Sequence, residues 1–254
     1  MAIMSTIGDP HSAPVPDPRS APAPRQQIYV WELPVRMTHW LIFFSILILS
    51  ATGYYIGHPF IGVPGPATDG YFVMGTARAI HLYTAIVFSL AVLVRIYWMF
   101  VGNGYARLTQ FIPLTRGRLR NVGDTFLYFC FVRRDLDTYP GHDALAAATY
   151  GLIFLIYLLL IATGLMLYTV YAPVNSPFQL FRFLIPVFGG LPVARLIHVI
   201  CMWVVLIFAV IHIYSVWMFS TFQRFGIADS IFSGYKFVPT RKYKLASGPQ
   251  ANPS

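Results

Sequence analysis

Four long apolar runs dominate the hydrophobic pattern of the chain. Each is at least about 18 residues long and nearly free of charge, which is the length an α-helix needs to cross a bilayer. The runs cover about residues 38–57, 79–100, 146–169 and 196–219. Arg95 is the one full charge well inside any of them. The pattern predicts an all-α membrane protein built as a bundle of four transmembrane helices.

The composition supports a membrane protein and argues against a soluble one. Of 254 residues, 57% are hydrophobic and only 11% are charged, whereas a soluble domain carries roughly a quarter charged residues. The net charge of +9 lies in the loops and tails that flank the apolar runs. Because no separate basic stripe exists, the positive charge does not indicate nucleic-acid binding.

The basic residues are distributed unequally between the loops, and this predicts the orientation. Residues 101–145 and the C-terminal tail carry most of them. The other two connections, 58–78 and 170–195, contain only Arg78, Arg182 and Arg195. Basic residues accumulate on the cytoplasmic side of a membrane. We therefore expect a multi-pass protein of the cell inner membrane, with both termini and the middle loop in the cytoplasm.

The chain divides into three predicted parts. Residues 1–27 are rich in Pro and Ala and predict a disordered cytoplasmic tail. Residues 28–235 form the membrane domain, and residues 236–254 form a basic cytoplasmic tail. The first connection, 58–77, is expected to be non-helical because of its Pro and Gly content, and the third, between residues 170 and 195, to contain a short amphipathic segment.

Four histidines lie inside the apolar runs, where ionisable side chains are costly and mark candidate functional sites. His39, His81 and His198 each follow an arginine by three residues, and His212 follows His198 by fourteen. Fourteen helical residues rise about 21 Å and make just under four turns. His198 and His212 therefore project from one helix face at two depths.

The predicted topology pairs the four histidines by depth. The first helix runs outward and the fourth inward, so His39 and His212 share the cytoplasmic depth and form an inner pair. The second helix also runs inward, so His81 and His198 form an outer pair. Two imidazoles from different helices are the axial ligands of a b-type haem. The sequence predicts two stacked haem irons, ligated by these pairs, and no catalytic residue.

Four arginines are candidate partners of haem propionates. An arginine at i, i+3 shares the face of its histidine, and guanidinium binds carboxylates in bidentate fashion. Arg36, Arg78 and Arg195 stand in this relation to histidines, although they could instead be interfacial anchors. Arg95 lies fourteen residues after His81, so it is a candidate for the propionates of the inner haem.

A short sequence repeat, here called the echo, accompanies the histidines. Ala51-Thr52-Gly53 and Ala162-Thr163-Gly164 both stand near the outer ends of outward-running helices. Small residues allow close approach to the backbone. The echo is compatible either with simple helix packing or with clearance for a porphyrin.

Several stretches carry a resemblance to a known family, namely Arg36–Trp40, Thr52–Gly57, Met74–His81, Gly102–Arg107 and His212–Tyr214. From Tyr29 to about Tyr235 the chain resembles the b-type cytochrome subunit of membrane-bound nickel–iron uptake hydrogenases, a di-haem family similar to cytochrome b561. One departure is Val199, where many members carry a basic residue or a second histidine.

The resemblance implies an electron-transfer subunit with two haem b groups. It would anchor a nickel–iron hydrogenase, receive electrons from the iron–sulfur small subunit at the outer haem, and pass them from the inner haem to a quinone. The implied partners are the small subunit, the large subunit through it, the quinone and the lipid bilayer. The chain has no CxxC pair for a metal cluster, so it is not expected to split hydrogen itself.

Two other functions remain open from the sequence. The cytochrome b subunit of a formate dehydrogenase or thiosulfate reductase shares the four-helix, two-haem plan, although the stretches 74–98 and 102–107 favour the hydrogenase type. A haem-free membrane anchor, in which the histidines only bridge helices, would show no visible absorbance.

Overall fold

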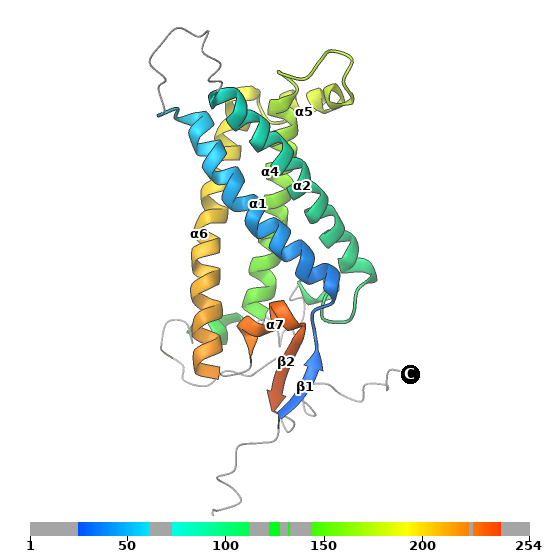
Figure 1. The fold of residues 1–254 in the computed structure, drawn as a ribbon, viewed down its shortest axis with the longest axis vertical. Coiled ribbons are helices and arrows are strands. Elements are labelled where there is room, and N and C mark those ends of the chain that lie inside the picture. Colours follow the sequence, from blue (N-terminus) through cyan, green and yellow to red (C-terminus); the bar gives the residue numbers. More distant parts are fainter. Residues whose placement is uncertain are drawn as a thin grey trace, which may run out of the picture.

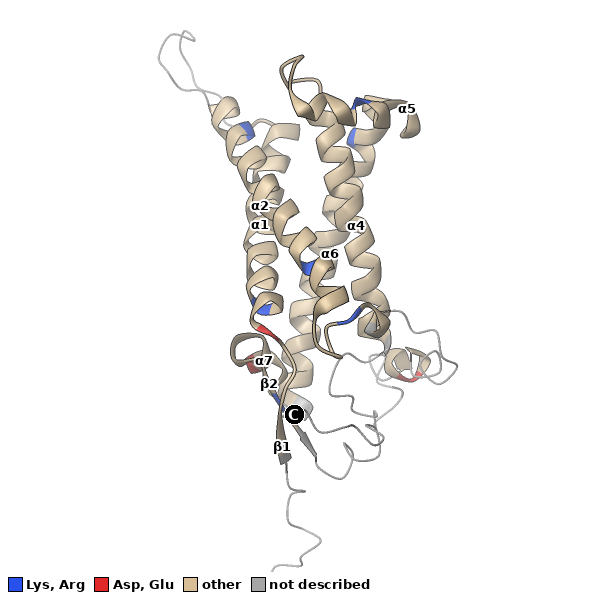
Figure 2. Cartoon of the chain, turned by 90° about the vertical axis from the view of Figure 1, so that its right-hand side faces the viewer, with Lys and Arg blue, Asp and Glu red and all other residues tan. Residues whose placement is uncertain are grey.

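The computed structural model describes residues 25–60, 73–111, 122–127, 132, 144–223 and 226–239. Its main elements are the helices α1 (Leu33–Gly57), α2 (Val73–Val101), α4 (Ala144–Tyr168) and α6 (Leu191–Gln223). All four are long and apolar enough to cross a membrane, and together they form a bundle (Figure 1). Charged residues lie mostly toward its two ends (Figure 2). The predicted fold class is confirmed.

The helices begin earlier along the chain than the apolar runs. α1 starts at Leu33 with Pro34 in its first turn, where a missing backbone N–H is not needed for an intrahelical bond. α2 starts at Val73, so the prediction that the first connection is non-helical as far as residue 77 is wrong. Hydropathy marks only the part of a helix that is apolar enough for hydrocarbon, and residues 73–77 contain no proline that would end the helix earlier.

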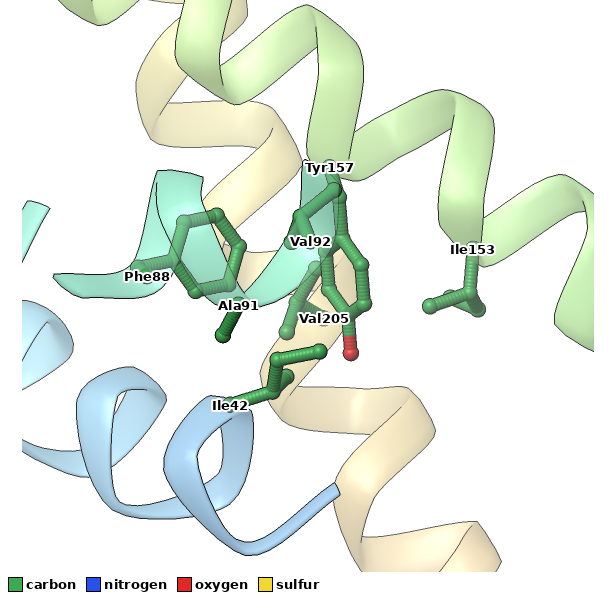
Figure 3. Close-up of a cluster of buried hydrophobic side chains, with 7 residues drawn as sticks. All are labelled: Ile42, Phe88, Ala91, Val92, Ile153, Tyr157 and Val205. Atoms are coloured by element: carbon green, nitrogen blue, oxygen red, sulfur yellow. The ribbon is translucent and has the colours of Figure 1, made fainter. Parts of the chain in front are cut away.

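The bundle is made of two closely packed helix pairs. α1 lies along α2 and α4 lies along α6, while contacts between the two pairs are much sparser. Side chains from all four helices meet in an apolar layer (Figure 3) formed by Ile42, Phe88, Ala91, Val92, Ile153, Tyr157 and Val205. The Phe88 and Tyr157 rings pack edge to face at 5.2 Å. This layer is where the two pairs are held together.

The third connection, for which the sequence predicted one short amphipathic segment, contains two short helical segments. η2 (Pro177–Phe183) and α5 (Leu184–Val187) follow each other at the end of the bundle opposite to the strands (Figure 1). Leu180 and Val187 are exposed to more than two thirds, at 73% and 71%. Their apolar side chains suit a position at a membrane surface.

The two ends of the membrane domain are joined by a small structure, here called the clasp (residues 25–32 and 227–239). β1 (Arg25–Tyr29) pairs antiparallel with β2 (Tyr235–Pro239), and α7 (Ile227–Ser233) leads into β2. Trp31 Nε1 donates a hydrogen bond to Ser230 Oγ at 3.1 Å. The boundaries expected for the two tails, after residue 27 and before residue 236, lie within these strands.

A carboxylate connects the clasp to the end of α2. Glu32 Oε2 accepts hydrogen bonds from Trp98 Nε1 at 2.7 Å and from the Asn103 backbone N–H at 2.9 Å. Asn103 Nδ2 donates to the Val30 carbonyl at 2.9 Å. Since Glu32 directly precedes α1, these bonds fix the start of the helix that carries His39.

We expect Gly234→Ala to open the clasp. Gly234 has φ +88°, and its carbonyl accepts from the Val30 and Trp31 N–H groups at 2.8 and 3.1 Å. A Cβ here would lie 2.6 Å from Tyr29 Cε2 and 2.8 Å from the Trp31 carbonyl oxygen. The left-handed conformation alone costs a non-glycine residue roughly 1–2 kcal/mol.

Faster limited proteolysis at the termini and a lower thermal unfolding midpoint would reveal the opening. Gly104→Ala is the matched control, because nothing lies within 4 Å of a Cβ at Gly104. Equal behaviour of the two variants would contradict the role given to Gly234.

Candidate haem centres

The structure brings together the histidines of each predicted pair. The ring centroids of His39 and His212 are 6.3 Å apart, and those of His81 and His198 are 6.5 Å apart. His39 comes from α1, His81 from α2, and the other two from α6. Each pair therefore consists of two rings from different helices that face each other across the interface between the two helix pairs.

The ring spacing fits a metal ion held between two imidazoles in trans. A metal–imidazole bond is about 2 Å long, and the ring centroid lies about 1.1 Å behind the bonded nitrogen, so two such rings on opposite sides of one ion have centroids about 6.2 Å apart. Both observed spacings agree with this value. Among the described residues, no group of three or more His, Cys, Asp or Glu side chains gathers as a further metal site. The two pairs fit the bis-histidine ligation of haem.

Hydrogen bonds orient both imidazoles of the outer pair. Thr52 Oγ1 lies 2.9 Å from His81 Nδ1 and donates its own proton to the Ile48 carbonyl at 2.7 Å. Thr163 Oγ1 makes the same 2.9 Å contact with His198 Nδ1 and likewise donates to the carbonyl four residues earlier, at 2.7 Å. Each threonine oxygen thus accepts from Nδ1–H. This arrangement leaves the lone pair on Nε2, where a metal would bind.

Two glycines make room for the same imidazoles. A Cβ on Gly53 would lie 3.2 Å from His81 Cε1, and one on Gly164 would lie 3.3 Å from His198 Cε1. The repeated Ala-Thr-Gly therefore supplies a hydroxyl and a space for each outer ligand. Sequence reasoning missed the contacts of Thr52 and Thr163, although the echo was the signal that could have revealed them.

The inner pair has different surroundings. Tyr150 OH lies 3.2 Å from His212 Nδ1, and the Phe208 ring stacks on the His212 ring at 5.5 Å with an interplanar angle of 21°. His39 Nδ1 is buried and has no hydrogen-bond partner among the described residues. Tyr150 carried no signal in the sequence, because a tyrosine near a helix end is common at membrane interfaces.

Arg95 is buried at the depth of the inner pair. Its side chain is only 6% exposed, and its guanidinium lies over the rings of Phe111 and Phe154 at 5.4 and 5.8 Å. It stands fourteen residues after His81 on α2, about 21 Å of helical rise farther along. Nη1 is buried without a hydrogen-bond partner in the described part of the chain. A buried cation with an unused donor is costly, so the site is suited to an anionic group such as a haem propionate.

The other three predicted arginines lie nearer the ends of the bundle. Arg36 Nη1 donates to the Ser233 carbonyl of the clasp at 3.3 Å, while its Nε is buried without an acceptor among the described residues. Arg78 lies over the Tyr171 ring at 5.3 Å. Arg195 is exposed. The side chain of Arg36 is thus engaged with the clasp, and Arg95 is the deeply buried one of the four.

By their positions along α2 and α6, residues of the apolar layer lie between the two histidine pairs. Val205 stands seven residues from both His198 and His212 on α6, about 10 Å of helical rise from each. Phe88 likewise stands seven residues after His81 on α2. The layer separates the pairs by packed apolar side chains and makes them two sites at different depths.

Comparisons with known proteins identify the family of the chain. The family model described as prokaryotic cytochrome b561 matches residues 30–234. A protein of Rhizobium leguminosarum bv. viciae named "Probable Ni/Fe-hydrogenase B-type cytochrome subunit" is 36% identical over 225 residues, which cover 86% of this chain and 92% of that protein. The protein of the same name from Cupriavidus necator is 31% identical over 211 residues, or 82% of this chain and 86% of the relative.

A third relative gives a similar result. The "Probable Ni/Fe-hydrogenase 1 B-type cytochrome subunit" of Escherichia coli K12 is 32% identical over 213 residues, covering 82% of this chain and 90% of that protein. The family model covers most of the chain, including both histidine pairs. The resemblance seen in the sequence is confirmed. The chain belongs to the prokaryotic cytochrome b561 family and is a b-type cytochrome, a haem protein of electron transport with transmembrane helices.

Proposed function

We propose that this chain holds two haem b groups and serves as the membrane electron-transfer subunit of a nickel–iron hydrogenase. The observation that carries the proposal is the pair of facing imidazoles at each of two depths, at 6.3 and 6.5 Å. The names of the relatives, all B-type cytochrome subunits of Ni/Fe-hydrogenases, support this partner over a formate dehydrogenase or a thiosulfate reductase.

The side chains around each pair perform distinct tasks. The four histidines supply Nε2 atoms, and Thr52 keeps the outer ring of His81 in the required tautomer. The apolar layer, with Val92 fully buried, keeps water from the interior between the pairs. When bound, the haems supply reversible one-electron chemistry, while the protein determines their depth, orientation and surroundings.

The distribution of charge supports an orientation. With the clasp on the cytoplasmic side of the inner membrane, both termini are cytoplasmic and the outer pair faces the periplasm. The outer pair then serves as the entry for electrons from the iron–sulfur small subunit, which in turn contacts the large subunit. The inner pair lies near the cytoplasmic surface, where a quinone in the bilayer is the acceptor.

The arginines complete the proposed sites. Arg95 is the partner of a propionate at the inner pair, because it is buried with an unused donor. Arg78 and Arg195 share helix faces with His81 and His198 and serve the outer propionates. Arg36 donates to the clasp through Nη1, and it contributes to the inner site through its buried, unpartnered Nε.

The test is to purify the chain together with the hydrogenase subunits and to follow its haem bands under hydrogen. We expect pyridine haemochrome analysis to give two haems b per chain. We also expect hydrogen to reduce both haems and a short-chain quinone to reoxidise them. The reduced-minus-oxidised spectrum is the measurement.

Other results would change the proposal in different ways. A chain without haem after adequate haem supply would support the haem-free anchor. Two haems that formate, but not hydrogen, reduces in the native complex would assign the chain to the other oxidoreductase type.

A further inference from the structure

The helices α1 and α4 repeat one another in sequence. Residues 38–53 and 149–164, offset by 111 positions, share the pattern T-x-x-L-I-F-x-x-x-L-x-L-x-A-T-G, which is nine identities in sixteen positions. The shared Ala-Thr-Gly occupies equivalent places in the structure, since both threonines contact the Nδ1 atom of a histidine at 2.9 Å.

The helices α2 and α6 repeat one another as well. Ala77-Arg78-x-Ile80-His81 recurs as Ala194-Arg195-x-Ile197-His198, an offset of 117 positions. Fourteen residues after each histidine stand Arg95-Ile96-Tyr97 and His212-Ile213-Tyr214 at the same offset. The pair α1 with α2 therefore corresponds to the pair α4 with α6.

This repeat makes the outer site symmetric and the inner site asymmetric. At the outer site each half supplies one arginine, one histidine and one threonine. At the inner site the first half supplies the ligand His39, whose counterpart in the second half is Tyr150. The second half supplies His212, whose counterpart is Arg95. Tyr150 OH lies 3.2 Å from His212 Nδ1, and Arg95 is buried at the depth of this pair.

The difference between the sites has an electrostatic consequence. A haem iron with two neutral imidazoles carries one more positive charge when oxidised than when reduced. An acceptor on Nδ1–H makes the ligand more electron-rich, stabilises the oxidised form and so lowers the reduction potential. A nearby buried cation destabilises the oxidised form and raises the potential.

Both effects act in the same direction here. Each outer ligand has a threonine acceptor at 2.9 Å. The arginines at that end, Arg78 and Arg195, are exposed, so their charge is screened more than that of a buried cation. The inner ligands have one longer contact, from His212 to Tyr150 at 3.2 Å, and one Nδ1 without a described partner, on His39.

Arg95 adds the second contribution. It is buried, at 6% exposed, and it stands fourteen residues after His81 on α2, about 21 Å of helical rise farther along, at the depth of the inner pair. A charge in this position is screened far less than one at the surface. It therefore favours the reduced form of the inner haem more strongly than Arg78 and Arg195 favour the reduced form of the outer haem.

We propose that this chain gives its two haems different reduction potentials, with the higher potential at the inner haem; this difference is here called the grading. Thr52 and Thr163 lower the potential of the outer haem, and Arg95 raises the potential of the inner haem. These three are positioning residues, since they act through the ligands or by charge. The grading rests on the proposed function, and it makes electron movement from the outer to the inner site favourable.

The test is an anaerobic redox titration of the full-length protein in detergent, followed through its haem bands. The unsubstituted protein is expected to show two one-electron midpoints. Thr52→Val and Thr163→Val are each expected to raise the lower midpoint and leave the higher one unchanged. The matched control is Thr149→Val, because the Thr149 hydroxyl donates to the Leu145 carbonyl and makes no contact with a histidine among those described.

Arg95 provides an independent arm if a threonine variant loses its haem. Arg95→Gln is expected to lower the higher midpoint alone, by an amount on the order of a tenfold change in the reduction equilibrium, which is about 59 mV for one electron. Arg95→Lys, which keeps the positive charge, is expected to keep the higher midpoint close to that of the unsubstituted protein.

Three results would overturn the grading. These are coincident midpoints in the unsubstituted protein, a shift of the higher midpoint by the threonine substitutions, or a shift of the lower midpoint by Arg95→Gln. Each of them leaves a chain with two haems, so the proposed function would stand. A chain without haem would instead contradict the proposed function itself.

Discussion

Replacing both histidines of one pair is expected to leave one haem per chain, whereas replacing one histidine from each pair is expected to leave none. The reason is that each iron needs two imidazoles, and the facing rings are His39 with His212 and His81 with His198. A single substitution already removes one axial ligand, so a second within the same pair removes nothing more.

Four purified variants measure this directly by pyridine haemochrome analysis. His81→Ala and the double variant His81→Ala/His198→Ala should both retain about one haem, the one at the inner pair. The double variant His81→Ala/His212→Ala should retain none. His58→Ala is the control, because His58 stacks on Tyr54 beyond the end of α1 and faces no other histidine in the described chain. One haem in the cross-pair variant would show that the histidines are paired differently.

Gly53→Val is expected to abolish the outer haem and spare the inner one. A Cβ at Gly53 would already lie 3.2 Å from His81 Cε1 and 3.7 Å from its Nδ1, and the γ-methyl groups of valine extend further toward the ring. The ring cannot shift without losing its 2.9 Å contact with Thr52 Oγ1. Small displacements of an axial ligand are sufficient to prevent iron ligation, because metal–ligand distances are narrowly defined.

The control for this variant lies on the same helix. Gly57→Val introduces the same side chain into α1, but nothing lies within 4 Å of a Cβ there. Both substitutions change helix propensity by a similar few tenths of a kcal/mol, in favour of valine, so the difference in haem content reports the contact with the imidazole. Gly164→Val should reproduce the loss through His198, at 3.3 Å.

Two outcomes would contradict the inference that Gly53 leaves room for the His81 imidazole. Retention of two haems in Gly53→Val would show that the ring has room to move. Simultaneous loss of both haems, while Gly57→Val keeps both, would show that the two sites are not independent and that the apolar layer does not separate them.

Local periodicity was sufficient to predict the bundle and the histidine pairs. Apolar length specifies the number of spans, and a spacing of fourteen residues places His198 and His212 on one face. Alternating helix direction then assigns each histidine a depth. The depth of a residue follows from its position along a helix, so the order of residues in the sequence is enough to predict it. The ring spacings of 6.3 and 6.5 Å agree with the histidine pairs that these depths predicted.

Contacts between helices could not be obtained in the same way. The hydrogen bond from His198 to Thr163 joins residues 35 positions apart, and the one from His212 to Tyr150 joins residues 62 apart. Which helices are neighbours, and how each is rotated about its axis, depends on packing of the whole bundle. Apolar residues surround these helices on all sides because lipid replaces water as the solvent, so the pattern does not mark an inward face.

The sequence by itself determined the class of the protein, the count of its spans, the depth of its four histidines and the family it resembles. Only the tertiary structure decided that β1 meets β2 across the whole length of the chain, that Arg95 is buried while Arg195 is exposed, and that Tyr150 contacts His212. The physical reason is that hydropathy and helical periodicity are properties of consecutive residues, whereas burial and hydrogen bonding are properties of neighbours brought together by folding.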